Sequence, residues 1–140
     1  MRSETAVSPS GLSGLEAATT AKLAQINNAA QKAFDLLKAS YPEGEVLSWY
    51  KQEAEARAVI AGETTATPFL SALAGERGLS LDELAARVIA KTDAYAERSG
   101  SIAGQRQRLE DLLGACATAD DVNALEVSIS PGEGMPCITG

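Results

Sequence analysis

The apolar residues of this chain recur at intervals of three and four, and this spacing constrains the fold more than any other feature of the sequence. Its clearest stretch keeps a seven-residue rhythm from Leu81 to about Cys116. Such spacing places apolar side chains on one face of a helix, whereas a strand would need strict alternation. Apolar runs never exceed four residues, so no segment resembles a membrane span or a secretory signal. For 140 residues we therefore expect an all-α fold, a small helical bundle of about four to five helices.

Composition divides the chain into four expected segments. Residues 1–14 carry four serines, one proline and two glycines, which is typical of a flexible arm. Residues 15–40 are expected to form an Ala-rich helix, whose apolar stripe consists of Leu23, Ile26, Ala30, Ala33 and Leu37. This stripe either covers the core of its own domain or forms a short coiled coil that allows oligomerisation. Residues 41–126 form a helical module, and residues 127–140, with two prolines and three glycines, form an extended C-terminal tail.

Start and stop signals subdivide the first half of the module. One helix is expected from about Gly44 to Ala61, where a glycine follows and ends it. The next helix begins at Thr67-Pro68, because threonine caps free backbone amides and proline is suited to the first helical position. Gly78 is expected to end this second helix.

A long helix is expected to follow. The capping box from Ser80 to Glu83 begins it. Gly100 and Gly104 interrupt its apolar rhythm, which favours two helices or one bent helix over a straight rod. Thr118 begins a last short helix that ends near residue 126. The bulky residues expected to form one core within the module are Trp49, Phe69, Leu73, Leu84 and Val88.

The charge balance excludes several classes of function. The chain has 12 Lys and Arg residues, 19 Asp and Glu residues and no histidine, which gives a net charge of −7. An acidic surface repels phosphates, so we expect neither nucleic acid nor an anionic membrane as a partner. The absence of histidine removes Ser-His and Cys-His catalysis and histidine metal sites. The sequence therefore predicts no catalytic, cofactor-binding or metal-ligating residues.

The cysteines and the basic residues fit the same interpretation. Cys116 and Cys137 are too few for a structural zinc site and are spaced unlike a redox CxxC. We expect two reduced thiols, with a single disulfide as the alternative. Arg106 and Arg108 form the one compact basic spot in the sequence, and they are expected to pair with the acidic residues that follow them.

A series of short motifs follows in order from residue 41 onward. They are Tyr41-Pro42, Glu45, Ser48-Trp49, Gln52-Glu53-Ala54, Glu55-Ala56, Thr67-Pro68-Phe69-Leu70, Leu73-Ala74, Arg77-Gly78, Leu84-Ala85, Val88-Ile89, Tyr95, Gly104-Gln105-Arg106-Gln107 and Leu109-Glu110-Asp111. Each motif alone is common. The ordered run over residues 41–125 resembles a module in small tail proteins of tailed bacteriophages and prophages, which are often encoded beside tail-fibre genes.

The resemblance implies a helical, non-enzymatic protein without cofactors that acts through protein–protein contacts. It would be a structural component of the tail, tail fibre or baseplate, or a tail-fibre assembly factor. The chain lacks the long β-rich amino half of many such proteins, which leaves both roles open. Its expected partners are other phage tail or tail-fibre proteins, or further copies of itself. The expected location is the bacterial host cytoplasm during assembly, and the virion tail for a permanent component.

Two regions are expected to make the partner contacts, the apolar stripe of the first helix and the extended tail. The tail is expected to become ordered only against a partner, because an extended segment can add to a partner's surface. The residues assigned to these contacts are Leu23, Ile26, Ala30, Leu37, Val127 and Ile129. The alternative function is an acidic phage-encoded regulatory protein that binds and inhibits a host factor, which would need carboxylates concentrated on one face.

Overall fold

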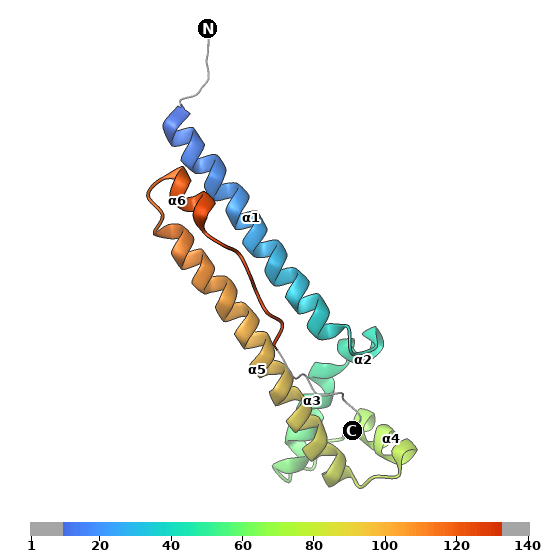
Figure 1. The fold of residues 1–140 in the computed structure, drawn as a ribbon. Coiled ribbons are helices and arrows are strands. Elements are labelled where there is room, and N and C mark those ends of the chain that lie inside the picture. Colours follow the sequence, from blue (N-terminus) through green and yellow to red (C-terminus); the bar gives the residue numbers. More distant parts are fainter. Residues whose placement is uncertain (1–9, 133–140) are drawn as a thin grey trace. The chain divides into compact units, whose positions relative to one another are not determined.

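The computed structural model describes residues 10–132, and these residues form helices and loops without a strand (Figure 1). The expected all-α fold is confirmed. The helices of this described range are α1 (Ser10–Lys38), α2 (Glu43–Leu47), α3 (Trp49–Ile60), α4 (Pro68–Arg77), α5 (Leu81–Gly114) and α6 (Ala119–Ala124). The expected arm at residues 1–14 lies mostly outside the described residues, and its last part, from Ser10, already belongs to α1.

The described residues divide into two compact units. Unit 1 contains residues 10–36 and 100–132, and unit 2 contains residues 37–99. Helix α5 contributes its first part to unit 2 and its last part to unit 1. The two units therefore cut across the expected segments, because the end of the expected module packs with the first helix.

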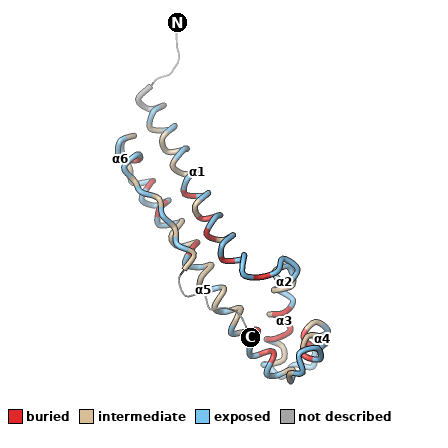
Figure 2. Tube along the Cα trace, turned by 45° about the vertical axis from the view of Figure 1, so that its right-hand side comes forward, coloured by how far each residue is buried: buried red, intermediate tan, exposed pale blue. Residues whose placement is uncertain are grey.

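Unit 1 has an apolar core made by α1, the end of α5 and α6. Ile26 and Val122 are fully buried, and Leu109 and Leu113 are nearly so. Burial of one such side chain stabilises a fold by about 1.5–3 kcal/mol. Figure 2 shows buried positions recurring along α1 at helical spacing. Within unit 1 the stripe of α1 thus covers its own core, as one of the two interpretations of the sequence predicted.

The segment after α6 is held against unit 1 by specific contacts. We call residues 125–132 the strap. The Nζ of Lys22 donates a hydrogen bond to the carbonyl oxygen of Leu125 at 2.8 Å. The side-chain amide of Gln105 donates to the carbonyl of Ser130 and accepts from its N–H, both at 2.9 Å. The strap has no regular secondary structure, and Figure 1 shows it, in orange-red, running alongside α1 and α5.

This arrangement corrects the expectation that the tail orders only against a partner. The side chains of Val127 and Ile129, two residues apart, both point to the same side of the segment. Both pack against the core of unit 1. Residues 133–140 of the expected tail, including Cys137, lie outside the described residues. Cys116 is half-buried against the same core, and its Sγ donates to the carbonyl of Leu112 at 3.4 Å.

Unit 2 is built by α3, α4 and the first part of α5. Its buried cluster consists of Ala56, Leu70, Ala74, Leu84, Ala85 and Val88. Of the five residues expected to form this core, Leu84 and Val88 belong to the cluster, while Phe69 and Leu73 pack against it half-buried. The prediction that Trp49 belongs to this core is wrong. Its ring packs edge-on between two tyrosines, with centroid distances of 4.7 Å to Tyr41 and 4.5 Å to Tyr95.

Two local features of unit 2 differ from the sequence predictions. The single helix expected from Gly44 to Ala61 is broken at Ser48, whose hydroxyl donates to the carbonyl of Glu45 at 2.7 Å. A serine that bonds nearby backbone competes with the helical hydrogen bonds, so it can separate two helices without a proline or glycine. At the start of α4, the Thr67 side chain makes no capping hydrogen bond.

A buried carboxylate from α3 replaces that missing cap. Glu55 is 4% exposed, and its two oxygens accept hydrogen bonds from the backbone N–H groups of Leu70 at 2.9 Å and Phe69 at 3.3 Å. A helix N-terminus has free N–H groups and a positive dipole end, so a carboxylate stabilises it. Glu55 therefore fixes α4 against α3.

Candidate partner-binding pocket

The residues assigned to partner contacts are largely covered by the chain itself. Ile26, Ala30 and Leu37 are 0–3% exposed. Leu23, Val127 and Ile129 are half-buried and pack against the core of unit 1. In the described structure these side chains therefore pack within their own chain, and their contact with a partner stays a prediction. An apolar stripe identifies the buried face of a helix, but it does not identify which element covers that face.

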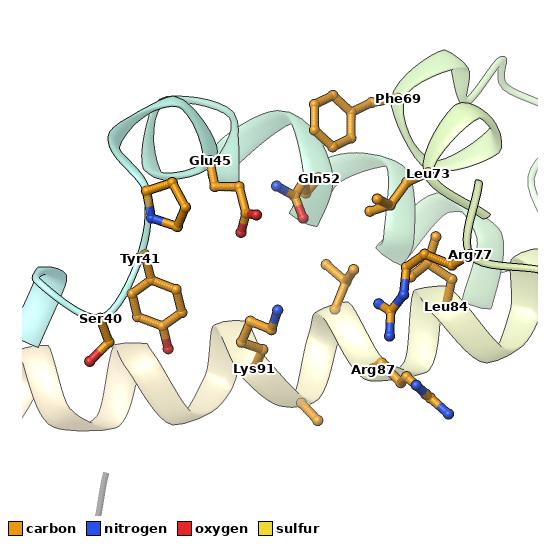
Figure 3. A pocket seen from close by; sticks show the side chains of 13 residues that line it. Ser40, Tyr41, Glu45, Gln52, Phe69, Leu73, Arg77, Leu84, Arg87 and Lys91 are labelled. Atoms are coloured by element: carbon orange, nitrogen blue, oxygen red, sulfur yellow. The ribbon is translucent and has the colours of Figure 1, made fainter. Parts of the chain in front are cut away.

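A pocket in unit 2 is a better candidate. Its volume is about 710 Å³, and its walls come from the loop before α2, from α2 and α3, from α4 and from α5 (Figure 3). We call it the unit 2 pocket. All of its lining residues belong to unit 2, between Ser40 and Lys91.

The floor of the unit 2 pocket is apolar. Phe69 and Leu73 reach it from α4, and Leu84 and Val88 reach it from α5. Leu84 and Val88 are also members of the buried cluster of unit 2. Because the side chains that form the floor also hold the unit together, the shape of the pocket is fixed by the packing of the core.

Cations line one side of the pocket. Arg77 lies at the end of α4, while Arg87 and Lys91 lie four residues apart and hence on one face of α5. Arg87 pairs with the exposed Glu83 at 2.9 Å. Within residues 10–132, neither Arg77 nor Lys91 forms an ion pair. Glu45 is the one carboxylate among the lining residues, so this pocket is locally cationic in a chain of net charge −7.

A buried amide adds a fixed hydrogen-bonding group. Figure 3 shows the side chain of Gln52 pointing into the pocket from α3. Its Nε2 donates to the Ser48 hydroxyl at 2.8 Å, and that hydroxyl donates to the carbonyl of Glu45. Among the described residues no donor bonds the Oε1 of Gln52. This oxygen therefore remains able to accept a hydrogen bond from a ligand.

Tyr41 closes one end of the pocket. Its side chain is buried, and no other described residue hydrogen-bonds its hydroxyl. Burial raises the pKa of this hydroxyl above its ordinary value, and Tyr95 raises it further, because both disfavour the phenolate. The aromatic packing of Tyr41 with Trp49 anchors the loop before α2 at this end of the pocket.

Sequence reasoning missed the cations of the pocket. They lie on two helices and are separated by up to 14 residues, so they form no compact basic motif in the sequence. Arg106 and Arg108, in contrast, are two residues apart. Arg106 donates hydrogen bonds to Asn27 at 3.2 Å and to Glu110 at 3.4 Å, so the expected ion pair is confirmed for Arg106, whereas Arg108 forms none among the described residues. A usable signal was the helical spacing of Leu84, Val88 and Lys91, which places a cation on the apolar face of α5.

Comparison with known families gives one finding. A family model described as the HI1402 helical domain matches residues 90–127, about a quarter of the chain. The match begins at the pocket, follows α5 to its end and includes α6. Comparisons with curated proteins and with solved structures give no significant match. In the described part of the chain, no helix is both long and apolar enough to cross a membrane. Over residues 90–127, then, the chain is similar to the HI1402 helical domain.

Proposed function

We propose that this chain is a non-enzymatic tail protein of a tailed bacteriophage or prophage, acting by protein–protein contacts as a tail, tail-fibre or baseplate component or as a tail-fibre assembly factor. The assignment to phage tail proteins comes from the motif resemblance over residues 41–125, and the observation that supports action through protein–protein contacts is the unit 2 pocket. It combines an apolar floor, a cationic side and a free hydrogen-bond acceptor on a packed helical support. A side chain of a partner protein fits such a combination, because apolar pockets with a polar rim anchor residues at protein–protein interfaces.

Several residues of the motifs that resemble phage tail proteins also line this pocket. The motif residues that line it are Tyr41, Pro42, Glu45, Gln52, Phe69, Leu73, Arg77, Leu84 and Val88. They come from separate motifs spread over about 50 residues, and folding brings them around one concave surface. This convergence supports a shared binding role for the module, and it moves the proposed partner contact from the termini to unit 2.

The alternative of an acidic inhibitor receives less support. That function needs carboxylates gathered on one face without cations among them. Instead, ion pairs spaced four residues apart join Glu53 to Arg57, Glu83 to Arg87 and Glu110 to Arg106. Interspersed charges of both signs reduce the local negative field.

A co-expression experiment tests the proposed function. The tagged full chain is expressed with each tail, tail-fibre and baseplate protein encoded beside it, and co-purification is measured. Leu73→Gln changes the pocket floor, and Leu47→Gln, at a residue 77% exposed on α2, is the matched control. We expect a tail protein to co-purify with the parent chain and with Leu47→Gln, and to be lost with Leu73→Gln.

Circular-dichroism melting of both variants separates loss of binding from loss of folding. Lys91→Glu, a change at a half-buried residue of the pocket, is a second variant in case Leu73→Gln unfolds. If no neighbouring tail protein co-purifies with the parent chain, the proposed function is wrong. If Leu47→Gln alone loses the partner, the contact lies on exposed apolar residues outside the pocket.

A further inference from the structure

We propose that the unit 2 pocket binds an acidic peptide segment of the partner protein, with an apolar side chain on the pocket floor and a carboxylate at the Arg77 end. This inference rests on the proposed function and adds the chemical class of the bound segment. Three features of the pocket favour such a ligand: its charge, its apolar floor and the positions of its polar groups.

The charge of the pocket is opposite to that of the chain as a whole. Three of the 12 basic residues line this pocket, together with one carboxylate. Arg77 and Lys91 have no ion-pair partner among residues 10–132, and the Glu83 partner of Arg87 is itself half exposed. Cations left without carboxylates are available to an incoming anion. Because the net charge is −7, the chain as a whole repels an acidic segment, whereas the cations of this pocket attract one.

The apolar floor indicates that the ligand carries an apolar group in addition to its negative charge. Leu73 and Phe69 are half-buried, so part of each side chain stays in contact with solvent in the pocket. An apolar side chain of the ligand would remove this surface from water. A free inorganic anion would leave it exposed. The floor thus favours a peptide with an apolar residue beside its acidic one.

The polar groups give the bound segment a direction. Figure 3 shows Glu45 toward one end of the pocket, Arg77 and Arg87 at the other, and Lys91 between them. Glu45 repels a second carboxylate at its own end, so the acidic residue belongs at the Arg77 end. Gln52 lies between the ends, where its free Oε1 can accept a hydrogen bond from a peptide N–H.

A nucleic acid is the competing anionic ligand. Its phosphates would need several cations along a track, because each neutralised phosphate needs its own contact. The pocket has three cations, which line it together with apolar side chains, and the chain as a whole is acidic. These observations favour the peptide, and the experiment below includes an oligonucleotide as a separate probe.

Peptide selection on the full chain tests this inference. A random library of 12-residue peptides is selected against the purified protein, and affinities of the enriched peptides are measured by fluorescence anisotropy. The pocket variant is the double charge reversal Arg77→Glu, Lys91→Glu. The matched control is Lys32→Glu, Arg108→Glu, which changes the net charge equally at two exposed residues of unit 1. A single-stranded DNA 12-mer is measured in parallel.

We expect enriched peptides to carry Asp or Glu next to an apolar residue. The pocket variant should bind them at least about tenfold more weakly, while the control variant changes the affinity less than about twofold. Enrichment of neutral or basic peptides, equal weakening in both variants, tighter binding of the DNA or no enrichment at all would each overturn the inference.

The two proposals fail in distinguishable ways. If a tail protein co-purifies through the pocket but no acidic peptide is enriched, the proposed function stands and the ligand class is wrong. If acidic peptides bind the pocket but no tail protein co-purifies, the ligand class stands and the tail assignment is wrong.

Discussion

The buried cap of α4 gives the sharpest test of how unit 2 is held together. Replacing Glu55 by alanine removes the acceptor for the N–H groups of Leu70 and Phe69, at 2.9 and 3.3 Å. Each buried donor left without a partner costs about 1–3 kcal/mol. The ion pair that Glu55 makes with Lys51 at 3.4 Å adds little, because the lysine side chain is 59% exposed. For the two donors together, the free energy of unfolding should therefore fall by about 2–6 kcal/mol.

Two companion variants bracket that value. Glu55→Gln keeps one acceptor oxygen but loses the charge that favours a helix N-terminus, so we expect a loss of about 1–2 kcal/mol. Glu53→Ala removes a carboxylate from the same helix that pairs with Arg57 at 49% exposure, and it should cost less than about 0.5 kcal/mol. This comparison separates the cap from a general effect of removing negative charge.

Urea unfolding followed by tryptophan fluorescence measures the effect within unit 2. The chain has a single tryptophan, Trp49, which packs between Tyr41 and Tyr95 in that unit. Amide hydrogen exchange adds a local measurement, since the Leu70 amide should lose protection when its acceptor is removed. If Glu55→Ala and Glu53→Ala have the same stability within about 0.5 kcal/mol, the cap does not carry the stability assigned to it.

Two further predictions concern the strap and the buried tyrosine. Gln105→Ala removes both hydrogen bonds to Ser130 and should cost about 1–2 kcal/mol, with faster exchange of the Ser130 amide; unchanged exchange would contradict the strap contact. Because the pKa of Tyr41 is raised in the folded state, the unfolded chain loses its proton first, so the contribution of Tyr41 to stability should be constant below about pH 10 and fall above it. Tyr41→Phe should reduce that fall in a series of urea titrations, and an identical alkaline profile for both proteins would refute the burial of this hydroxyl.

Local signals in the sequence predicted the helix starts well where the cap lies close in the chain. Ser80 accepts a hydrogen bond from the Glu83 N–H at 3.1 Å, and Thr118 accepts one from the Asp121 N–H at 3.0 Å. The start of α4 was also predicted correctly, but its cap was not. Glu55 precedes the amides it caps by 14 and 15 residues, and only the packing of α3 against α4 brings them together.

The glycines of α5 show where local propensity was overruled. Gly100 and Gly104 predicted two helices or one bent helix, and the first alternative is wrong because α5 is one helix from Leu81 to Gly114. Each glycine costs about 1 kcal/mol in a helix interior, which is small beside the burial of apolar neighbours. Ile102 is fully buried between them, and Leu109 belongs to the core of unit 1. The packing of these residues holds the helix together.

The candidate site was the least predictable part from sequence. The stripe of α1 was found correctly as an apolar face, but periodicity is identical for a face that binds a partner and one that binds its own chain. The pocket depends on side chains from four helices and a loop. Arg77 and Lys91 line the same pocket only because of the turn between α4 and α5, so no local motif predicts them.

Unit 1 is built from two segments that are far apart in the sequence, and this affects the order of folding during synthesis on the ribosome. Within the described residues, unit 2 is one uninterrupted run from residue 37 to 99, so all of its parts are present once that run has emerged. Helix α1 is synthesised before unit 2, but it can pack into unit 1 only after residues 100–132 have been synthesised. Leu125, the hydrogen-bond partner of Lys22, lies 103 positions later in the sequence. Domains fold largely as they are translated, so unit 2 precedes unit 1 on the nascent chain. Until then Ile26 and its neighbours on α1 remain uncovered, and this interval is when the chain is most exposed to aggregation and to capture by chaperones.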